Sequence, residues 1–85
     1  MAAAGVAEGL APDLAMQLAR ATVCGAGELA HLAHEPAAQL RINVTSPGGT
    51  TAAALAVLMA DETGFPGLLK RAVAAAASRG RELGK

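Results

Sequence analysis

The chain has 85 residues and a formal net charge of zero, because seven Lys or Arg residues balance seven Asp or Glu residues. This balance offers no basic surface to phosphates, and one aromatic residue, Phe65, offers little for bases to stack on, which argues against nucleic-acid binding. A hydrophobic content of 53% argues against a disordered chain. The longest uncharged run, residues 42–60, contains Pro47 and two glycines, so it does not predict a membrane span.

Alanine dominates the apolar residues of the chain. The sequence has 23 alanines and only 21 large apolar residues (Leu, Val, Ile, Met and Phe). A short chain of this composition buries little apolar surface when it is an isolated monomer. We therefore expect its helices to be covered by a partner.

The first residues and the cysteine content indicate the compartment. The start of the chain has no basic segment and carries Glu8, so it does not resemble a secretion signal. The single cysteine, Cys24, excludes an internal disulfide and a cysteine-based zinc site, and we expect it to be a buried, reduced thiol. These features predict a cytoplasmic protein.

The first half of the chain predicts two helices. Residues 2 to about 10 favour a helix but have no N-cap residue, as if they were the tail of a longer helix. Pro12 and Asp13 are typical of a helix start, and the second helix should run to about residue 34. Its apolar stripe, which we expect to pack against another copy of the helix, comprises Leu14, Leu18, Ala21, Gly25 and Leu29.

The second half predicts three more helices and no strand, so the expected fold class is all-α. A short helix over residues 36–43 is followed by a loop, and a fourth helix runs from residue 50 or 51 to 62, with Gly64 as its C-terminal cap. The fifth helix spans residues 66–83. Its expected inner side comprises Phe65, Leu69, Ala72, Val73, Ala76 and Leu83, and its expected solvent side comprises Lys70, Arg71, Arg79, Arg81 and Glu82.

The loop before the fourth helix reads S-P-G-G-T-T at residues 46–51. Free amide groups at a helix start, with two glycines and three hydroxyl groups beside them, can hold an anion. Because the loop has no Lys or Arg, a carboxylate suits it better than a polyphosphate. A tight Pro-Gly turn followed by a Thr N-cap is the alternative, and spacing alone favours this commoner arrangement.

Other candidate sites have little support. His31 and His34 lie three residues apart on the second helix, but a metal site needs a further ligand, so solvated histidines are the simpler interpretation. For Cys24 we favour a packing role over a reactive thiolate. No set of residues predicts a nucleophile with its base, so we expect neither catalytic residues nor a metal site in this chain.

The segment V-T-S-P-G-G-T-T at residues 44–51 resembles the signature loop of pyrroline-5-carboxylate reductases. The flanking Glu35-Pro36, the Ala-rich helix after the loop and the final Arg79 to Leu83 segment extend the resemblance over all 85 residues. Residues 61–63 form a slightly longer turn than is usual in the family, and Ile42 replaces a more polar residue. Neither departure lies in the loop.

The resemblance implies the C-terminal helical dimerisation domain of such an enzyme, spanning residues 1–85 and interlocked with a second copy. The family reduces 1-pyrroline-5-carboxylate to L-proline with NADPH or NADH. Its Rossmann domain and Gly-rich nucleotide fingerprint are absent here, so this chain alone should bind no cofactor and be inactive. The residues implied to bind the substrate carboxylate are Ser46, Gly48, Gly49, Thr50 and Thr51.

Two other functions stay open beside a homodimeric or larger reductase assembly. The chain could be a stand-alone oligomerisation module that has no ligand and no activity. It could also be a carboxylate-binding module that works with a Rossmann domain on a separate chain. Stabilisation by L-proline would separate the first of these from the two functions that involve a ligand.

Overall fold

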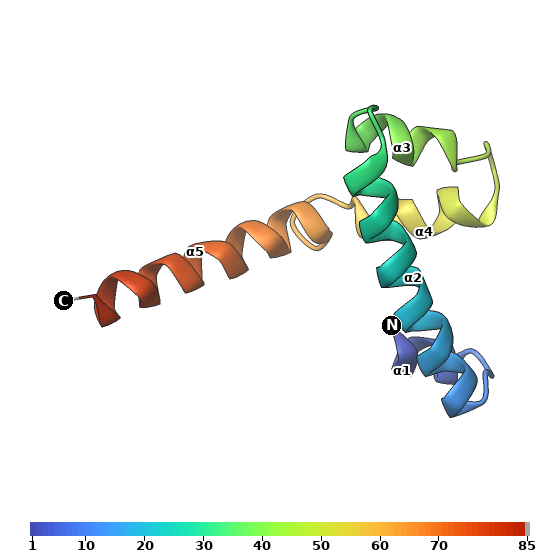
Figure 1. Ribbon diagram of the computed structural model, residues 1–85, viewed down its shortest axis with the longest axis horizontal. Helices are drawn as coiled ribbons and strands as arrows, with labels where there is room; N and C mark the ends of the chain where they lie inside the picture. Colours follow the sequence, from blue (N-terminus) through green and yellow to red (C-terminus); the bar gives the residue numbers. More distant parts are fainter. Residues whose placement is uncertain (85) are drawn as a thin grey trace. The chain divides into compact units, whose positions relative to one another are not determined.

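A computed structural model describes residues 1–84 of the chain (Figure 1). The described residues form five α-helices and no strand, which confirms the predicted all-α class. The helices are α1 (Ala2–Ala7), α2 (Pro12–Leu32), α3 (Ala37–Asn43), α4 (Thr50–Leu58) and α5 (Phe65–Leu83). None of them is both long enough and apolar enough to cross a membrane. Interlocking with a second copy stays a prediction.

The chain divides into two compact units, the first comprising residues 1–40 and the second beginning at Arg41. In the first unit α1 packs against α2. Gly5 lies at this contact, since a Cβ atom built there would lie 3.1 Å from Cδ1 of Leu10 and 3.4 Å from the Cβ atom of Ala15. Ala15 is 3% exposed and is the one buried hydrophobic side chain among residues 1–84. The contact between α1 and α2 is therefore made by small residues.

A Schellman motif ends α1 earlier than predicted. Gly9 adopts a φ of +103°, a left-handed conformation that glycine tolerates best. The Gly9 amide donates to the Val6 carbonyl at 3.0 Å, and the Leu10 amide donates to the Gly5 carbonyl at 3.0 Å. These two bonds satisfy carbonyl groups that the helix leaves unpaired. They turn the chain toward Pro12, where α2 begins as predicted.

The end of α4 differs from the prediction. The helix stops at Leu58 rather than near residue 62, and Gly64 is the N-cap of α5 rather than the C-terminal cap of α4. In the turn between them Glu62 has a φ of +66°, which is unusual for a residue with a side chain. The guanidinium group of Arg71 donates to the Glu62 carbonyl at 3.2 Å. Arg71 therefore holds the turn and is not simply a solvated charge.

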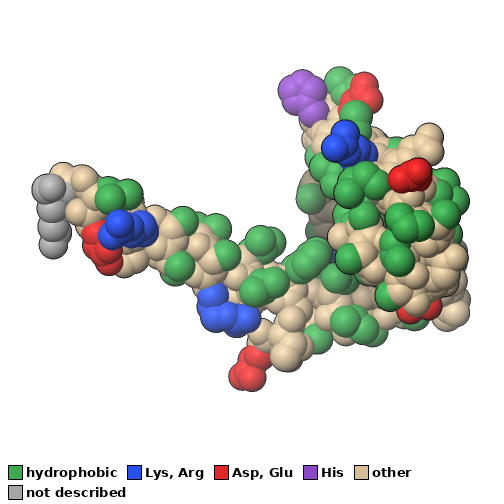
Figure 2. Space-filling model, turned by 90° about the horizontal axis from the view of Figure 1, so that it is seen from below, with side chains coloured by type: hydrophobic (Ala, Val, Ile, Leu, Met, Phe, Trp, Pro, Cys, Tyr) green, Lys and Arg blue, Asp and Glu red, His purple; other side chains and the backbone are tan. Residues whose placement is uncertain are grey.

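Large apolar side chains are mostly uncovered. Nineteen of them expose more than a third of their surface, and only Leu40 and Leu55 of the 21 in the sequence are more protected. The expected inner side of α5 is among the exposed groups, with Phe65 at 52% and Val73 at 66% exposure. Figure 2 shows hydrophobic side chains at the surface along α5. In the described residues no helix of the second unit packs along α5, so the chain itself leaves this side uncovered, and its cover by a partner stays a prediction.

Gly64 gives a test of the turn between α4 and α5. A Cβ atom at this position would lie 2.5 Å from the carbonyl oxygens of Leu58 and Ala60. We expect Gly64→Ala to lower the free energy of unfolding by about 1–3 kcal/mol, the usual range for overpacking. Gly80→Ala in α5 is the control, because no atom lies within 4 Å of its added Cβ, and it should be stabilising by about 0.5–1 kcal/mol.

Denaturant unfolding followed by circular dichroism, at one protein concentration for all variants, measures both changes. A Gly64→Ala variant as stable as the original chain would contradict the close backbone packing at this turn.

Candidate functional site

The loop between α3 and α4 brings the predicted binding residues together. The Gly49 amide donates to the Ser46 carbonyl at 3.0 Å and closes a four-residue turn. Pro47 fixes its own φ, and Gly48 has a φ of +70°, the combination that defines a type II turn. The turn places Ser46 beside the start of α4, because a Cβ atom at Gly49 would lie 3.2 Å from the Ser46 carbonyl oxygen.

The start of α4 is free of side-chain capping. Its N-cap is Gly49, which has no side chain to accept hydrogen bonds from the first amides of the helix. Thr50 and Thr51 are the first two helical residues, so neither is the N-cap. The alternative explanation of the loop, a turn followed by a Thr N-cap, is therefore correct about the turn and wrong about the cap.

Three hydroxyl groups lie at this end of α4. Thr50 is exposed and Thr51 is half-buried, while Ser46 is exposed in the turn. Within residues 1–84 none of these hydroxyl groups makes a hydrogen bond. The helix dipole adds a partial positive charge here. The arrangement can bind a small anion, and it provides no base or nucleophile.

The predicted packing stripe of α2 does not include Ala15, the buried residue of this helix. All five of its residues are exposed, including Leu14 at 44%, Leu18 at 47% and Leu29 at 51%. A Cβ atom added at Gly25 would meet nothing within 4 Å, so no neighbour within this chain requires a glycine there. The stripe is thus available to a partner.

Glycines at Gly25 and Gly27, followed by Ala30, have the spacing of a dinucleotide-binding loop. That loop works at a turn between a strand and a helix, where backbone amides reach the pyrophosphate. Here the three residues lie inside the continuous helix α2, whose amides bond within the helix. The residues of this chain therefore do not fit a nicotinamide cofactor.

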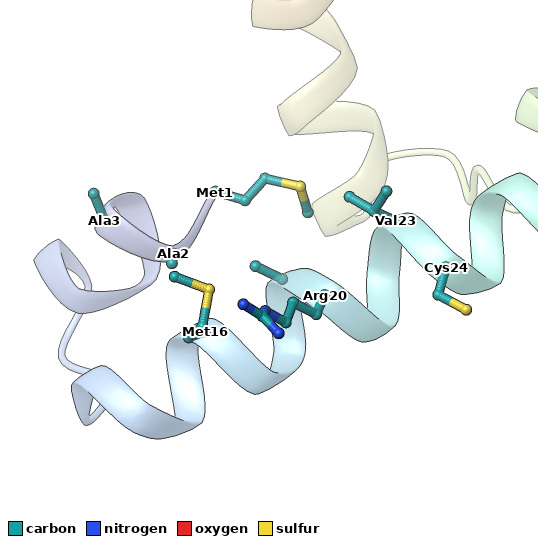
Figure 3. A pocket seen from close by; sticks show the side chains of 8 residues that line it. Met1, Ala2, Ala3, Met16, Arg20, Val23 and Cys24 are labelled. Carbon is teal, nitrogen blue, oxygen red and sulfur yellow. The ribbon is translucent and has the colours of Figure 1, made fainter.

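A depression of about 660 Å³ lies in the first unit between α1 and α2. Figure 3 shows Met1 and Ala2 on one side of it and Met16, Arg20 and Val23 on the other. No sequence pattern indicated this depression. Its lining is apolar apart from Arg20, so few polar groups are present to orient a small ligand.

Among residues 1–84, Cys24 and the two histidines belong to no group of three potential metal ligands. Cys24 lines the same depression and is exposed, so the prediction of a buried thiol was wrong. In the described part of the chain no three His, Cys, Asp or Glu residues come together as metal ligands, and His31 lies in the last turn of α2.

Gly48 gives a test of the turn geometry. An alanine at a φ of +70° is strained, so we expect Gly48→Ala to lower the free energy of unfolding by about 1–2 kcal/mol. Gly48→Asn should lower the free energy of unfolding by less, because asparagine tolerates the left-handed region better than alanine does. Denaturant unfolding of the two variants measures the difference. Equal stability of Gly48→Ala and the original chain would contradict the type II turn.

Comparison with known proteins identifies the family of the chain. The family described as pyrroline-5-carboxylate reductase dimerisation matches residues 1–83. Pyrroline-5-carboxylate reductase of Pisum sativum is 51% identical over 98% of this chain and 30% of its own length. The same enzyme of Synechocystis is 46% identical over 100% of the chain and 31% of its own length. That of Pseudomonas aeruginosa is 40% identical over 98% of the chain and 30% of its own length.

The chain thus spans about a third of the length of these relatives. No solved structure matches it. The match over residues 1–83, together with identities of 40–51%, shows that the chain belongs to the pyrroline-5-carboxylate reductase dimerisation family.

Proposed function

We propose that this chain is the dimerisation part of a cytoplasmic pyrroline-5-carboxylate reductase and that its loop binds the substrate carboxylate. The residues assigned to this contact are Ser46, Gly48, Gly49, Thr50 and Thr51. The observation that carries the proposal is the uncapped start of α4, where Gly49 is the N-cap and three nearby hydroxyl groups make no hydrogen bond within residues 1–84. Relatives named pyrroline-5-carboxylate reductase, at up to 51% identity, support the choice of ligand.

The charge of the site agrees with a carboxylate. The N-terminus of a helix carries about half a positive charge, which stabilises a single negative charge nearby. No Lys or Arg lies in residues 46–51, so a polyphosphate would be poorly neutralised. Glycine at position 49 leaves the first turn of α4 open to a ligand. The ligand class is therefore a small monocarboxylate, such as 1-pyrroline-5-carboxylate or L-proline.

We do not assign the hydride transfer to this chain. Reduction of the imine needs a hydride from NADPH or NADH, and the residues of this chain do not fit such a cofactor. We therefore assign no catalytic residue here. The chain contributes binding of the carboxylate, which orients the ring of the substrate, while a Rossmann domain holds the nucleotide.

Self-association is the second part of the proposal. The stripe of α2 that begins at Leu14 and ends at Leu29 is exposed, as is most of α5. Pairing with a second copy removes these apolar side chains from water, which is favourable in proportion to the area covered. We propose a homodimer or a higher homo-oligomer built on these helices.

A stand-alone oligomerisation module is the alternative function. The exposure of nineteen large apolar side chains favours association by itself, whether or not the loop has a ligand. L-Proline distinguishes the two functions, since a ligand that binds the folded state raises the melting temperature by mass action. A carboxylate-binding module that works with a Rossmann domain on a separate chain would show the same stabilisation.

Thr51→Ala tests the carboxylate contact. In the full-length reductase that contains this chain, we expect the KM for 1-pyrroline-5-carboxylate to rise about tenfold or more. Hydrogen bonds to charged groups contribute about 1.5–3 kcal/mol. Thr51→Ser, which keeps the hydroxyl group, should stay close to the original KM. Steady-state kinetics measures both, and an unchanged KM in Thr51→Ala would remove Thr51 from the site.

Gly25→Leu tests the packing stripe. A leucine in the middle of the stripe should keep the two copies apart, so we expect the absolute mass from light scattering to fall toward that of one chain. Gly27→Leu is the matched control, because it lies two residues further along α2, on nearly the opposite face. If Gly25→Leu keeps the mass of the original assembly, the stripe is not the interface.

A further inference from the structure

Thr45 lies two residues after the end of α3 and immediately before the turn that begins at Ser46. Its hydroxyl group donates to the carbonyl of Arg41 at 2.5 Å, and its backbone amide donates to the carbonyl of Ile42 at 3.1 Å. The last four carbonyl groups of a helix have no partner within the helix. Thr45 therefore satisfies two of them, and its side chain is half-buried where it does so.

These two bonds fix the direction in which the chain leaves α3. The next hydrogen bond along the chain joins the Gly49 amide to the Ser46 carbonyl, so the α3 cap and the type II turn follow each other without a free residue between them. Any rotation at Thr45 is thereby transmitted to Ser46. The position of the Ser46 hydroxyl group relative to α4 depends on both features.

Arg41 links the same cap to the other end of α4. Its carbonyl group accepts the bond from Thr45, and its guanidinium group lies 3.8 Å from the sulfur of Met59, the C-cap residue of α4. One residue of α3 thus contacts the residue before the turn and the residue after α4. This arrangement makes α3 the support on which the turn and α4 are held.

We propose that Thr45 is a positioning residue for carboxylate binding: its hydroxyl group holds the α3 end so that Ser46 faces the first turn of α4. The proposal rests on the proposed function of the loop. Thr45 itself touches the Arg41 carbonyl and acts on the ligand only through Ser46 and the turn. Its role is therefore distinct from that of the residues assigned to the carboxylate contact.

Thr22 provides a matched control within the chain. Its hydroxyl group donates to the Leu18 carbonyl at 2.7 Å, also four residues earlier. Thr22 lies inside α2, which continues for ten residues to Leu32, so this bond caps no helix end and precedes no turn. Both variants lose the same type of bond, so a difference between them is due to the position of the Thr45 bond before the turn.

The experiment compares Thr45→Val, Thr45→Ser and Thr22→Val in the complete chain, with L-proline as the probe. Nuclear magnetic resonance titration gives the Kd for L-proline. The hydrogen-exchange rate of the Gly49 amide, measured without ligand, reports how often its bond to the Ser46 carbonyl opens. For Thr45→Val we expect a Kd about threefold to tenfold higher, the range of one hydrogen bond. We expect its Gly49 amide to exchange several-fold faster, and the other two variants to stay within about twofold of the original chain.

The outcomes separate this proposal from the proposed function. If the original chain binds no L-proline, the proposed function fails in this chain, and the exchange of Gly49 still tests whether Thr45 orders the turn. If the original chain binds L-proline and Thr45→Val binds it equally well, the positioning role is wrong and the proposed function stands. If Thr45→Val does not fold, Thr45→Ala replaces it. If neither variant folds, the role of Thr45 is purely structural and the proposal is wrong.

Discussion

The exposure of its large apolar side chains is the constraint on which the rest of this structure depends. Alanine packs closely, as Ala15 does against Gly5, but it buries little surface per residue. The larger side chains, from Leu14 in α2 to Leu83 in α5, stay in contact with water within one chain. A fold with so little internal burial would gain stability from association, so we expect the assembly and the folding of this chain to be coupled.

Within that constraint local backbone geometry determines the turns, and the glycines in them act for two different reasons. Gly9 and Gly48 adopt positive φ values, one at the end of α1 and one in the type II turn. Gly64 has an ordinary φ, and carbonyl oxygens leave no space for a Cβ atom there. Such local devices act over a few residues and need no core. Such turns therefore form from local contacts wherever the helices that flank them are held.

This division explains what could be predicted from the sequence. Helix composition and the proline at position 12 predicted the elements, and the loop sequence together with its family resemblance predicted the turn. The end of α4, the exposure of Cys24 and the uncovered side of α5 were not predicted. An apolar stripe indicates that a face will be covered without saying which chain covers it. No sequence pattern indicated the steric requirement at Gly64 or the bond from Thr45 to Arg41.

The loop between α3 and α4 and the assembly of the chain are expected to depend on each other. The turn at residues 46–49 is closed by the bond from the Gly49 amide to the Ser46 carbonyl, and Thr45 before it is bonded to α3, but α3 and α4 are short helices without buried residues. Helices of seven and nine residues are marginal in water without tertiary packing. The loop therefore keeps its geometry only while the two helices that flank it are held. In a chain with this little internal core, we expect association to supply the contacts that hold them, so the proposed carboxylate site should be ordered in the assembled protein.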